Sequence, residues 1–116
     1  MPLLRIQTNV TLDQASRSTL AALASQRAAE LLGKNESYVM VSVETGLTML
    51  FSGNHRPLAY LELKSAELPA GKTRELSAGL CNLIHAELGI AADRVFIEFA
   101  DVARGMWGWN NTTLER

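Results

Sequence analysis

The feature of this chain that most constrains its fold is a sequence pattern that occurs twice, about half the chain apart. When the two halves are aligned, like residues coincide: Leu20 with Leu76, Leu32 with Leu88, Gly33 with Gly89, Val39 with Val95, and Val41 with Ile97. The glycine that ends a helix and the start of the following strand therefore coincide in both halves. We predict a duplicated βαβ unit, with pseudo-repeats at about residues 2–45 and 58–101, in a single domain over residues 1–116.

The first half begins with a loosely alternating segment, Leu3 to Thr8, which predicts a strand. The spacing of Thr11 and Gln14 is that of a capping box, so we expect a helix with Thr11 as its cap. Leucines and alanines then recur at helical spacing until Gly33, a residue that favours the left-handed end of a helix. The residues from Tyr38 to Val43 are rich in strand formers and predict a second strand.

The second half repeats this plan. Leu58 to Leu63 predicts a strand, and Pro69 suits the first turn of the helix that follows. Gly89 ends that helix, and Val95 to Phe99 predicts the returning strand.

These elements predict an α/β protein of the α+β sandwich type, with both helices on one face of a four-stranded mixed sheet. Each βαβ unit requires parallel pairing and a right-handed crossover. The other face would stay uncovered, although the strands carry many apolar residues: Val39, Val41, Val43, Leu61, Leu63, Phe96 and Ile97. We therefore expect that face to be buried against other copies of the chain in a ring. Two shorter strand-like segments, Leu47 to Phe51 and Met106 to Trp109, are candidates for pairing across subunit edges.

The charge of the chain argues against a nucleic-acid or membrane partner. The 11 basic and 12 acidic residues give a formal net charge of -1, and the basic residues are scattered along the sequence. No apolar stretch is long enough to cross a bilayer, and no signal-peptide pattern opens the chain. We expect a cytoplasmic protein.

Cysteine and histidine usage predicts neither a disulfide nor a metal site. Cys81 is the single cysteine, which excludes an internal disulfide and a CxxC redox pair. His55 and His85 have no plausible metal-ligand partners in the sequence, so no metal is expected.

Pro2, directly after Met1, is the residue that points to chemistry. Removal of Met1 would leave a secondary amine at the start of a strand, and a terminal amine titrates near pH ~8 in water. Burial in an apolar pocket lowers that pKa because desolvation disfavours the cation, and an amine poised near neutrality is a good general base. The alternative is an ordinary second-position proline without a role.

Four motifs, in order and at matching separations, resemble the macrophage migration inhibitory factor family of the tautomerase superfamily. They are Met1-Pro2 before a strand, Gly33-Lys34 at the end of the first helix, Asp93-Arg94-Val95-Phe96-Ile97 at the last long strand, and Gly108-Trp109-Asn110-Asn111-Thr112 near the end. The match runs essentially from end to end. The resemblance implies a cofactor-free homotrimer whose three sheets form a central barrel, with one active site at each subunit interface.

The resemblance also implies an activity, keto–enol tautomerisation of small aromatic α-keto acids such as phenylpyruvate. Pro2 matches the catalytic base, and Lys34 matches the lysine that pairs with the substrate carboxylate. Ser65 and Ala66 lie where family members offer backbone to the substrate. The residues that match the ring pocket, some of them reaching in from a neighbouring subunit, are Tyr38, Phe96, Trp107, Trp109 and Leu114.

The chain departs from the family pattern at several positions. Phe96 replaces a pocket tyrosine, and Glu98 replaces a pocket asparagine and would bring negative charge. Leu58 and Leu61 stand where the cytokine has its CxxC cysteines, so thiol oxidoreductase activity is not expected. Read alone, Lys34 is also typical of a solvated cation at a helix C-terminus. The alternative function is a binding or signalling protein of this family in which tautomerase activity is weak or vestigial.

Overall fold

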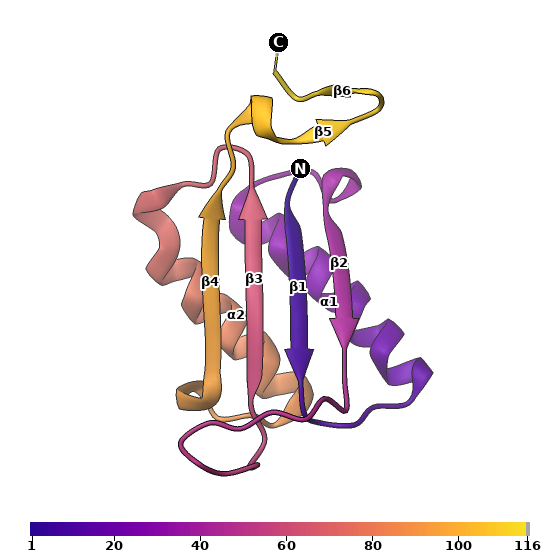
Figure 1. Ribbon diagram of the computed structural model, residues 1–116, viewed down its shortest axis with the longest axis vertical. Coiled ribbons are helices and arrows are strands. Elements are labelled where there is room, and N and C mark those ends of the chain that lie inside the picture. The colour runs from indigo at the N-terminus through magenta and orange to yellow at the C-terminus, as the bar shows by residue number, and fades with distance from the viewer. Residues whose placement is uncertain (116) are drawn as a thin grey trace.

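Two βαβ units share one four-stranded sheet in the computed structural model, which describes residues 1–115 (Figure 1). The elements of the two units are β1 (Leu3–Thr8), α1 (Gln14–Leu32), β2 (Met40–Glu44), β3 (Ala59–Ser65), α2 (Thr73–Leu88) and β4 (Val95–Asp101). The strand order is β2-β1-β3-β4, with β1 parallel to β2, β3 parallel to β4, and the central pair β1 and β3 antiparallel. This arrangement confirms the predicted duplicated unit and mixed sheet.

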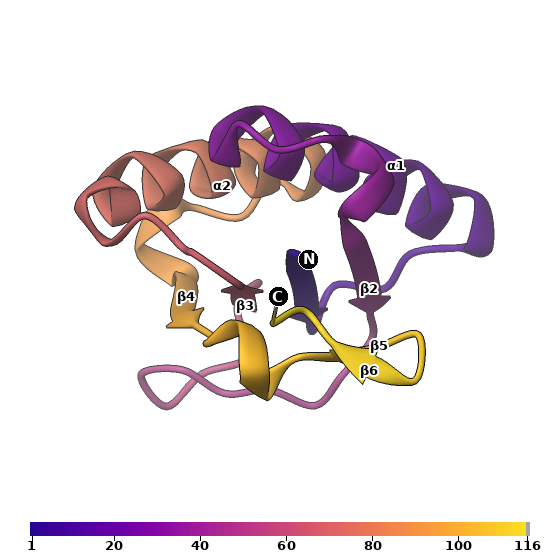
Figure 2. The ribbon, with the colours of Figure 1, turned by 90° about the horizontal axis from the view of Figure 1, so that it is seen from above.

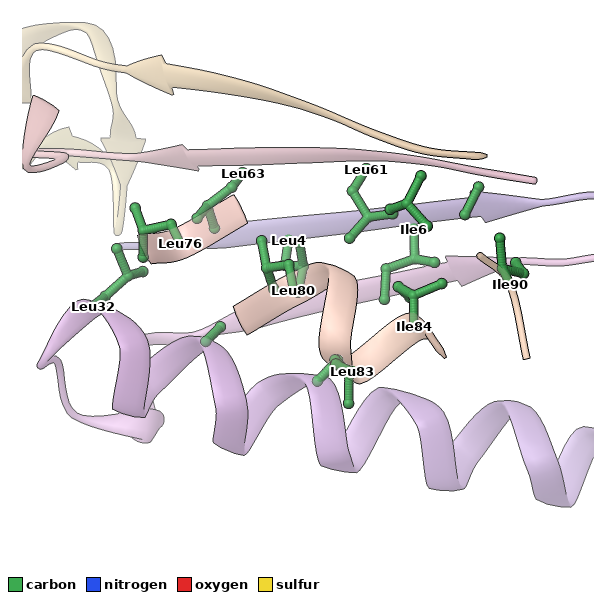
Figure 3. Packing of buried hydrophobic residues seen from close by; sticks show 14 of the residues in the cluster. Leu4, Ile6, Leu32, Leu61, Leu63, Leu76, Leu80, Leu83, Ile84 and Ile90 are labelled. Atoms are coloured by element: carbon green, nitrogen blue, oxygen red, sulfur yellow. The ribbon is translucent and has the colours of Figure 1, made fainter. Parts of the chain in front are cut away.

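Both helices cover the same face of the sheet, as predicted (Figure 2). Side chains alternate along the strands, so every second residue of β1 and β3 points toward the helices. The core between sheet and helices consists mostly of leucine and isoleucine (Figure 3), among them Leu4, Ile6, Leu61, Leu63, Leu76, Leu80, Ile84 and Ile90. Burial of each such side chain stabilises the fold by about 1.5–3 kcal/mol.

Both helices end at the predicted glycines, but the start of α1 differs from the prediction. Gly33 and Gly89 adopt φ of 64° and 69°, a left-handed conformation that glycine tolerates without strain. The N-terminal cap of α1 is Asp13, whose Oδ1 accepts a 2.8 Å hydrogen bond from the backbone N–H of Ser16. The prediction of Thr11 as the cap was wrong because the chain still turns away from β1 there.

The start of α2 also lies later than predicted. Pro69 precedes a 3-10 helix at Ala70–Lys72, and α2 begins only at Thr73. Pro69 is therefore outside the first turn of the α-helix. Further 3-10 helices occupy Glu36–Tyr38, Ala92–Arg94 and Arg104–Met106.

The uncovered face of the sheet is polar, which corrects the prediction of an apolar face that needs covering. Leu61 and Leu63 are 0% and 1% exposed beneath the helices, because they share the register positions of Ile6 and Leu4. The remaining predicted residues on the helix side, Val39, Val41, Val43 and Ile97, pack partly buried against the same core. The open face instead carries mostly polar residues, Arg5, Gln7, Ser42, Glu44, Tyr60, Glu62, Lys64 and Glu98, together with the apolar Leu3, Met40, Phe96 and Ala100.

The two predicted short strands behave differently. Leu47 to Phe51 forms no strand, only a single bridge between Phe51 and Asn54 around a tight turn. The second segment forms β5 (Gly108–Trp109), which pairs antiparallel with β6 (Thr112–Thr113) of the same chain. Asn110 and Asn111 connect them with φ of 51° and 64°, as expected for a two-residue hairpin turn. This hairpin lies across the end of the sheet at which β1 begins (Figure 1).

Candidate active site

A cavity of about 590 Å³ lies at the end of the sheet where β1 begins. Segments distant in sequence meet there: the chain start, the turn after α1, the turn after β3, and the β5–β6 hairpin. The lining residues are Met1, Lys34, Asn35, Tyr38, Ala66, Glu67, Arg104, Trp109, Thr113, Leu114 and Glu115. Among the predicted site residues, the structure thus brings Lys34, Tyr38, Ala66, Trp109 and Leu114 together.

Pro2 is fully buried directly behind Met1. Its carbonyl oxygen accepts a 2.9 Å hydrogen bond from the backbone N–H of Met40, which extends the pairing of β1 with β2. The first residue is thereby held at the sheet end instead of extending into solvent. The terminal amine of Met1 has a pKa lowered from 8.0, first by burial and then by the positive charges of Lys34 and Arg104, with Glu67 acting in the opposite direction.

Lys34 is a cation held in a fixed place by the turn after α1. The left-handed Gly33 turns the chain at the end of α1, and Lys34 Nζ donates hydrogen bonds to Ser65 Oγ at 2.7 Å and to the Ala66 carbonyl at 2.6 Å. Ser65 is fully buried, so it positions the lysine from behind the cavity wall. Burial is the main cause of the lowered pKa of Lys34. A partly desolvated ammonium attracts an anion more strongly than one in bulk water.

The apolar part of the cavity comes from Tyr38, Trp109 and Leu114. Tyr38 is the last residue of the 3-10 helix after α1. It does not belong to β2, so the prediction of a strand that begins at Tyr38 was wrong. Trp109 is on the hairpin and stays 52% exposed, so its ring is available to a flat ligand. Trp107 does not line the cavity, but its carbonyl accepts a 3.1 Å hydrogen bond from the backbone N–H of Leu114. It therefore supports the hairpin instead of contacting a ligand within one chain.

Phe96 and Glu98 lie on the open face of β4, away from the cavity of their own chain. Phe96 packs its ring against Phe51, with 4.6 Å between ring centroids. Glu98 Oε2 accepts a 3.0 Å hydrogen bond from the Tyr60 hydroxyl. Burial, together with hydrogen bonds to Glu98 and Glu62, raises the pKa of Tyr60 to about 12. The pocket roles of Phe96 and Glu98 thus stay predictions that require a second copy of the chain.

Sequence reasoning missed three charged residues of the cavity: Arg104, Glu67 and Glu115. Arg104 Nε donates to Glu67 Oε1 at 2.9 Å, and its Nη1 donates to the Leu114 carbonyl at 3.2 Å. Arg104 lies five residues before Trp109, so its closeness to the tryptophan motif was a usable signal. Nothing in the sequence indicated Glu67, which follows Ala66 at the cavity rim.

Within residues 1–115, no group of three or more His, Cys, Asp or Glu side chains is placed to hold a metal ion. No helix among these residues combines the length and apolar character needed to cross a membrane.

The sequence model of the family described as macrophage migration inhibitory factor matches residues 1–115, which is nearly the whole chain. The chain belongs to this family. Macrophage migration inhibitory factor from Mus musculus is 33% identical over 114 residues, covering 97% of this chain and 98% of the relative. The homolog from Brugia malayi is 36% identical with the same coverage. The family belongs to the tautomerase superfamily.

Solved structures of family members share the fold. The macrophage migration inhibitory factor homologue from Prochlorococcus marinus is 43% identical, with a TM-score of 0.91 over 97% of this chain and 99% of that one. The Entamoeba histolytica protein is 24% identical with a TM-score of 0.90 over 97% of each chain, a likeness that concerns the fold alone. Both the predicted family and the predicted fold are confirmed.

Proposed function

We propose that this protein is a keto–enol tautomerase that acts on small aromatic α-keto acids, with Pro2 as its general base. The observation that carries the proposal is that Pro2 lies buried directly behind Met1, and that Met1 lines a cavity which also holds the anchored cation of Lys34 and an aromatic wall. An α-keto acid with a ring needs three such parts: a base near the reacting carbon, a cation for the carboxylate, and an apolar surface.

In the proposed mechanism, excision of Met1 exposes the Pro2 ring nitrogen as a secondary amine. The substrate carboxylate binds Lys34, and its ring lies against Tyr38 and Trp109. The neutral amine takes a proton from the carbon next to the ketone, while the ketone oxygen gains a proton from solvent and becomes the enol hydroxyl. The reverse reaction returns the proton to carbon. Every proton that leaves the substrate is thus replaced, and no redox step occurs.

The local charges favour a neutral amine at physiological pH. Burial, Lys34 and Arg104 lower the pKa of the terminal amine of Met1 from its ordinary value of 8.0. A Pro2 amine at the same sheet end would experience the same influences, since the same cations surround it. General bases of this kind contribute on the order of 10²- to 10⁴-fold to rate.

We also propose that the active form is a homotrimer in which a neighbouring subunit brings Phe96 and Glu98 to the cavity. Both side chains lie on the open face of β4 and cannot line the cavity of their own chain. Several large apolar side chains are also exposed in a single chain, among them Met40 at 58%, Leu50 at 60% and Met106 at 80%. The polar open face fits a water-lined interior between sheets better than a dry contact.

The decisive experiment compares phenylpyruvate tautomerisation by the wild type, Pro2→Gly and Pro69→Gly. Intact mass must first show that Met1 is absent from the wild type. We expect Pro2→Gly to lose on the order of 100-fold or more in kcat/KM, because general-base catalysis is removed. Pro69→Gly is the matched control, since that proline lies outside the cavity. Equal rates in wild type and Pro2→Gly would remove Pro2 from the mechanism.

The alternative, a binding protein with a vestigial pocket, predicts a different outcome. Activity would stay at background in every variant, while a specific protein partner would bind the wild type and Pro2→Gly equally well.

A further inference from the structure

Arg104 gives the cavity a second positive charge, which the binding of a single substrate carboxylate does not require. Lys34 already offers an anchored ammonium, which suffices to pair with the one carboxylate of a simple α-keto acid. Arg104 lines the same cavity and is close enough to Lys34 for its charge to lower the pKa of that lysine. Two neighbouring cations are costly to hold together unless anions balance them, and in the empty cavity the carboxylates of Glu67 and Glu115 do so.

The contacts of Arg104 leave part of its guanidinium available. Nε donates to Glu67 Oε1, and Nη1 donates to the Leu114 carbonyl. The ion pair with Glu67 involves only Nε of the guanidinium, and Nη2 donates no hydrogen bond within residues 1–115. The side chains of Arg104 and Glu67 are 37% and 67% exposed, and an exposed ion pair contributes little to stability. An incoming carboxylate could therefore replace Glu67 at small cost and bind the guanidinium through two hydrogen bonds.

The backbone of Glu67 supports a functional reading of this pair. Glu67 adopts φ of 60°, a left-handed conformation that glycine reaches without strain and other residues reach at a cost. Strained residues of this kind cluster at functional sites. Here the strained position places a carboxylate on Arg104, so Glu67 balances and orients the guanidinium while the cavity is empty.

We propose that Arg104 is a specificity-determining residue that selects α-keto acids with a second carboxylate. The inference rests on the proposed function, since Lys34 takes the carboxylate next to the ketone and Arg104 takes the other one. Arg104 binds and orients, and the proton transfer at carbon is unchanged.

Binding is measured by titration calorimetry with phenylpyruvate, 4-carboxyphenylpyruvate and 2-oxoglutarate. In Arg104→Gln we expect the affinity for at least one dicarboxylate to fall about 10-fold or more, because a charge-assisted hydrogen-bond pair is lost. Affinity for phenylpyruvate should change less than about threefold, within the range of a neutral cavity substitution. Arg104→Lys should recover part of the lost affinity, since lysine restores the positive charge but not the paired donors of the guanidinium.

Glu67→Gln is the matched control, because it breaks the same ion pair but keeps the cation. We expect it to retain or increase the preference for dicarboxylates. If Glu67→Gln instead loses that preference as Arg104→Gln does, the ion pair of Arg104 with Glu67 has only a structural role and the proposal is wrong. Equal weakening of all three ligands in Arg104→Gln would also overturn it, since Arg104 would then act on the shared carboxylate.

Deuterium exchange at the carbon next to the ketone, followed by NMR in D₂O, separates this proposal from the proposed function. Arg104-dependent dicarboxylate binding without exchange would refute the tautomerase and support the assignment of Arg104. Exchange that depends on Pro2, with dicarboxylate binding that is indifferent to Arg104, would do the reverse.

Discussion

At the scale of single residues, the chemistry of the cavity depends on how charges act on one amine. Lys34 Nζ donates hydrogen bonds to Ser65 Oγ and to the Ala66 carbonyl, and these bonds hold its charge near the start of β1. Burial lowers the pKa of the terminal amine most, and the positive charges of Lys34 and Arg104 act in the same direction. A base that must be neutral to accept a proton is mostly in its active form only above its own pKa, and its activity declines as the pH falls below that value.

We therefore expect kcat for phenylpyruvate to rise with pH through the pKa of the Pro2 amine, which burial and the nearby cations should lower as they lower that of the Met1 amine, and to level off above it. In Lys34→Met the rising limb should move to higher pH, because a positive charge that disfavours the protonated amine is gone. KM should also increase, on the order of 10- to 100-fold, since a charged hydrogen-bond partner of the carboxylate is lost. Lys64→Met, on the open face, is the control. A limb that stays in place would show that Lys34 does not act on the base.

At the scale of elements, each helix ends where a glycine allows the chain to reverse. The second of these ends, at Gly89, lets α2 lead into the turn before β4, and its N–H bonds to the His85 carbonyl at 2.9 Å. The same device at Gly33 places Lys34 at the cavity. The duplicated fold thus contains the same helix-ending turn twice, and only the turn at Gly33 places a residue in the cavity.

Gly89→Ala should destabilise the protein by about 1–2 kcal/mol, because the added Cβ disfavours the left-handed conformation at φ of 69°. Urea unfolding measures the change. Gly71→Ala is the matched control, since Gly71 has no positive φ and no atom lies within 4 Å of an added Cβ. If both variants lost the same stability, backbone conformation would not be the cause.

At the scale of the whole molecule, the predicted site residues lie in two separate places on the sheet. One end holds the cavity, and the open face of β4 carries Phe96 and Glu98, which the family resemblance assigns to a pocket. The proposed symmetric ring of chains would reconcile these facts by placing one chain's β4 beside its neighbour's cavity.

Glu98→Gln should therefore raise kcat/KM for phenylpyruvate several-fold, because it removes a negative charge that opposes an anionic substrate. Glu62→Gln is the control, since Glu62 is 3.2 Å from the same Tyr60 hydroxyl but matches no pocket position. Sedimentation should show a trimer for all three proteins. Identical kinetics in Glu98→Gln and wild type, or a monomer in dilute solution, would contradict the proposed assembly.

The family resemblance predicted that Lys34 and Trp109 belong to one site. The amino-acid sequence alone determined the order of the main strands and helices, the two helix-ending glycines and the duplication. These features depend on spacing and on local conformational preference, which neighbouring residues in the chain decide. The tertiary structure decided which face of the sheet is apolar, because strand register, and not composition, places Leu61 and Leu63 under the helices. It also brought Arg104 to Glu67 and set Phe96 and Glu98 apart from the cavity, since contacts between distant segments leave no periodic trace in the sequence.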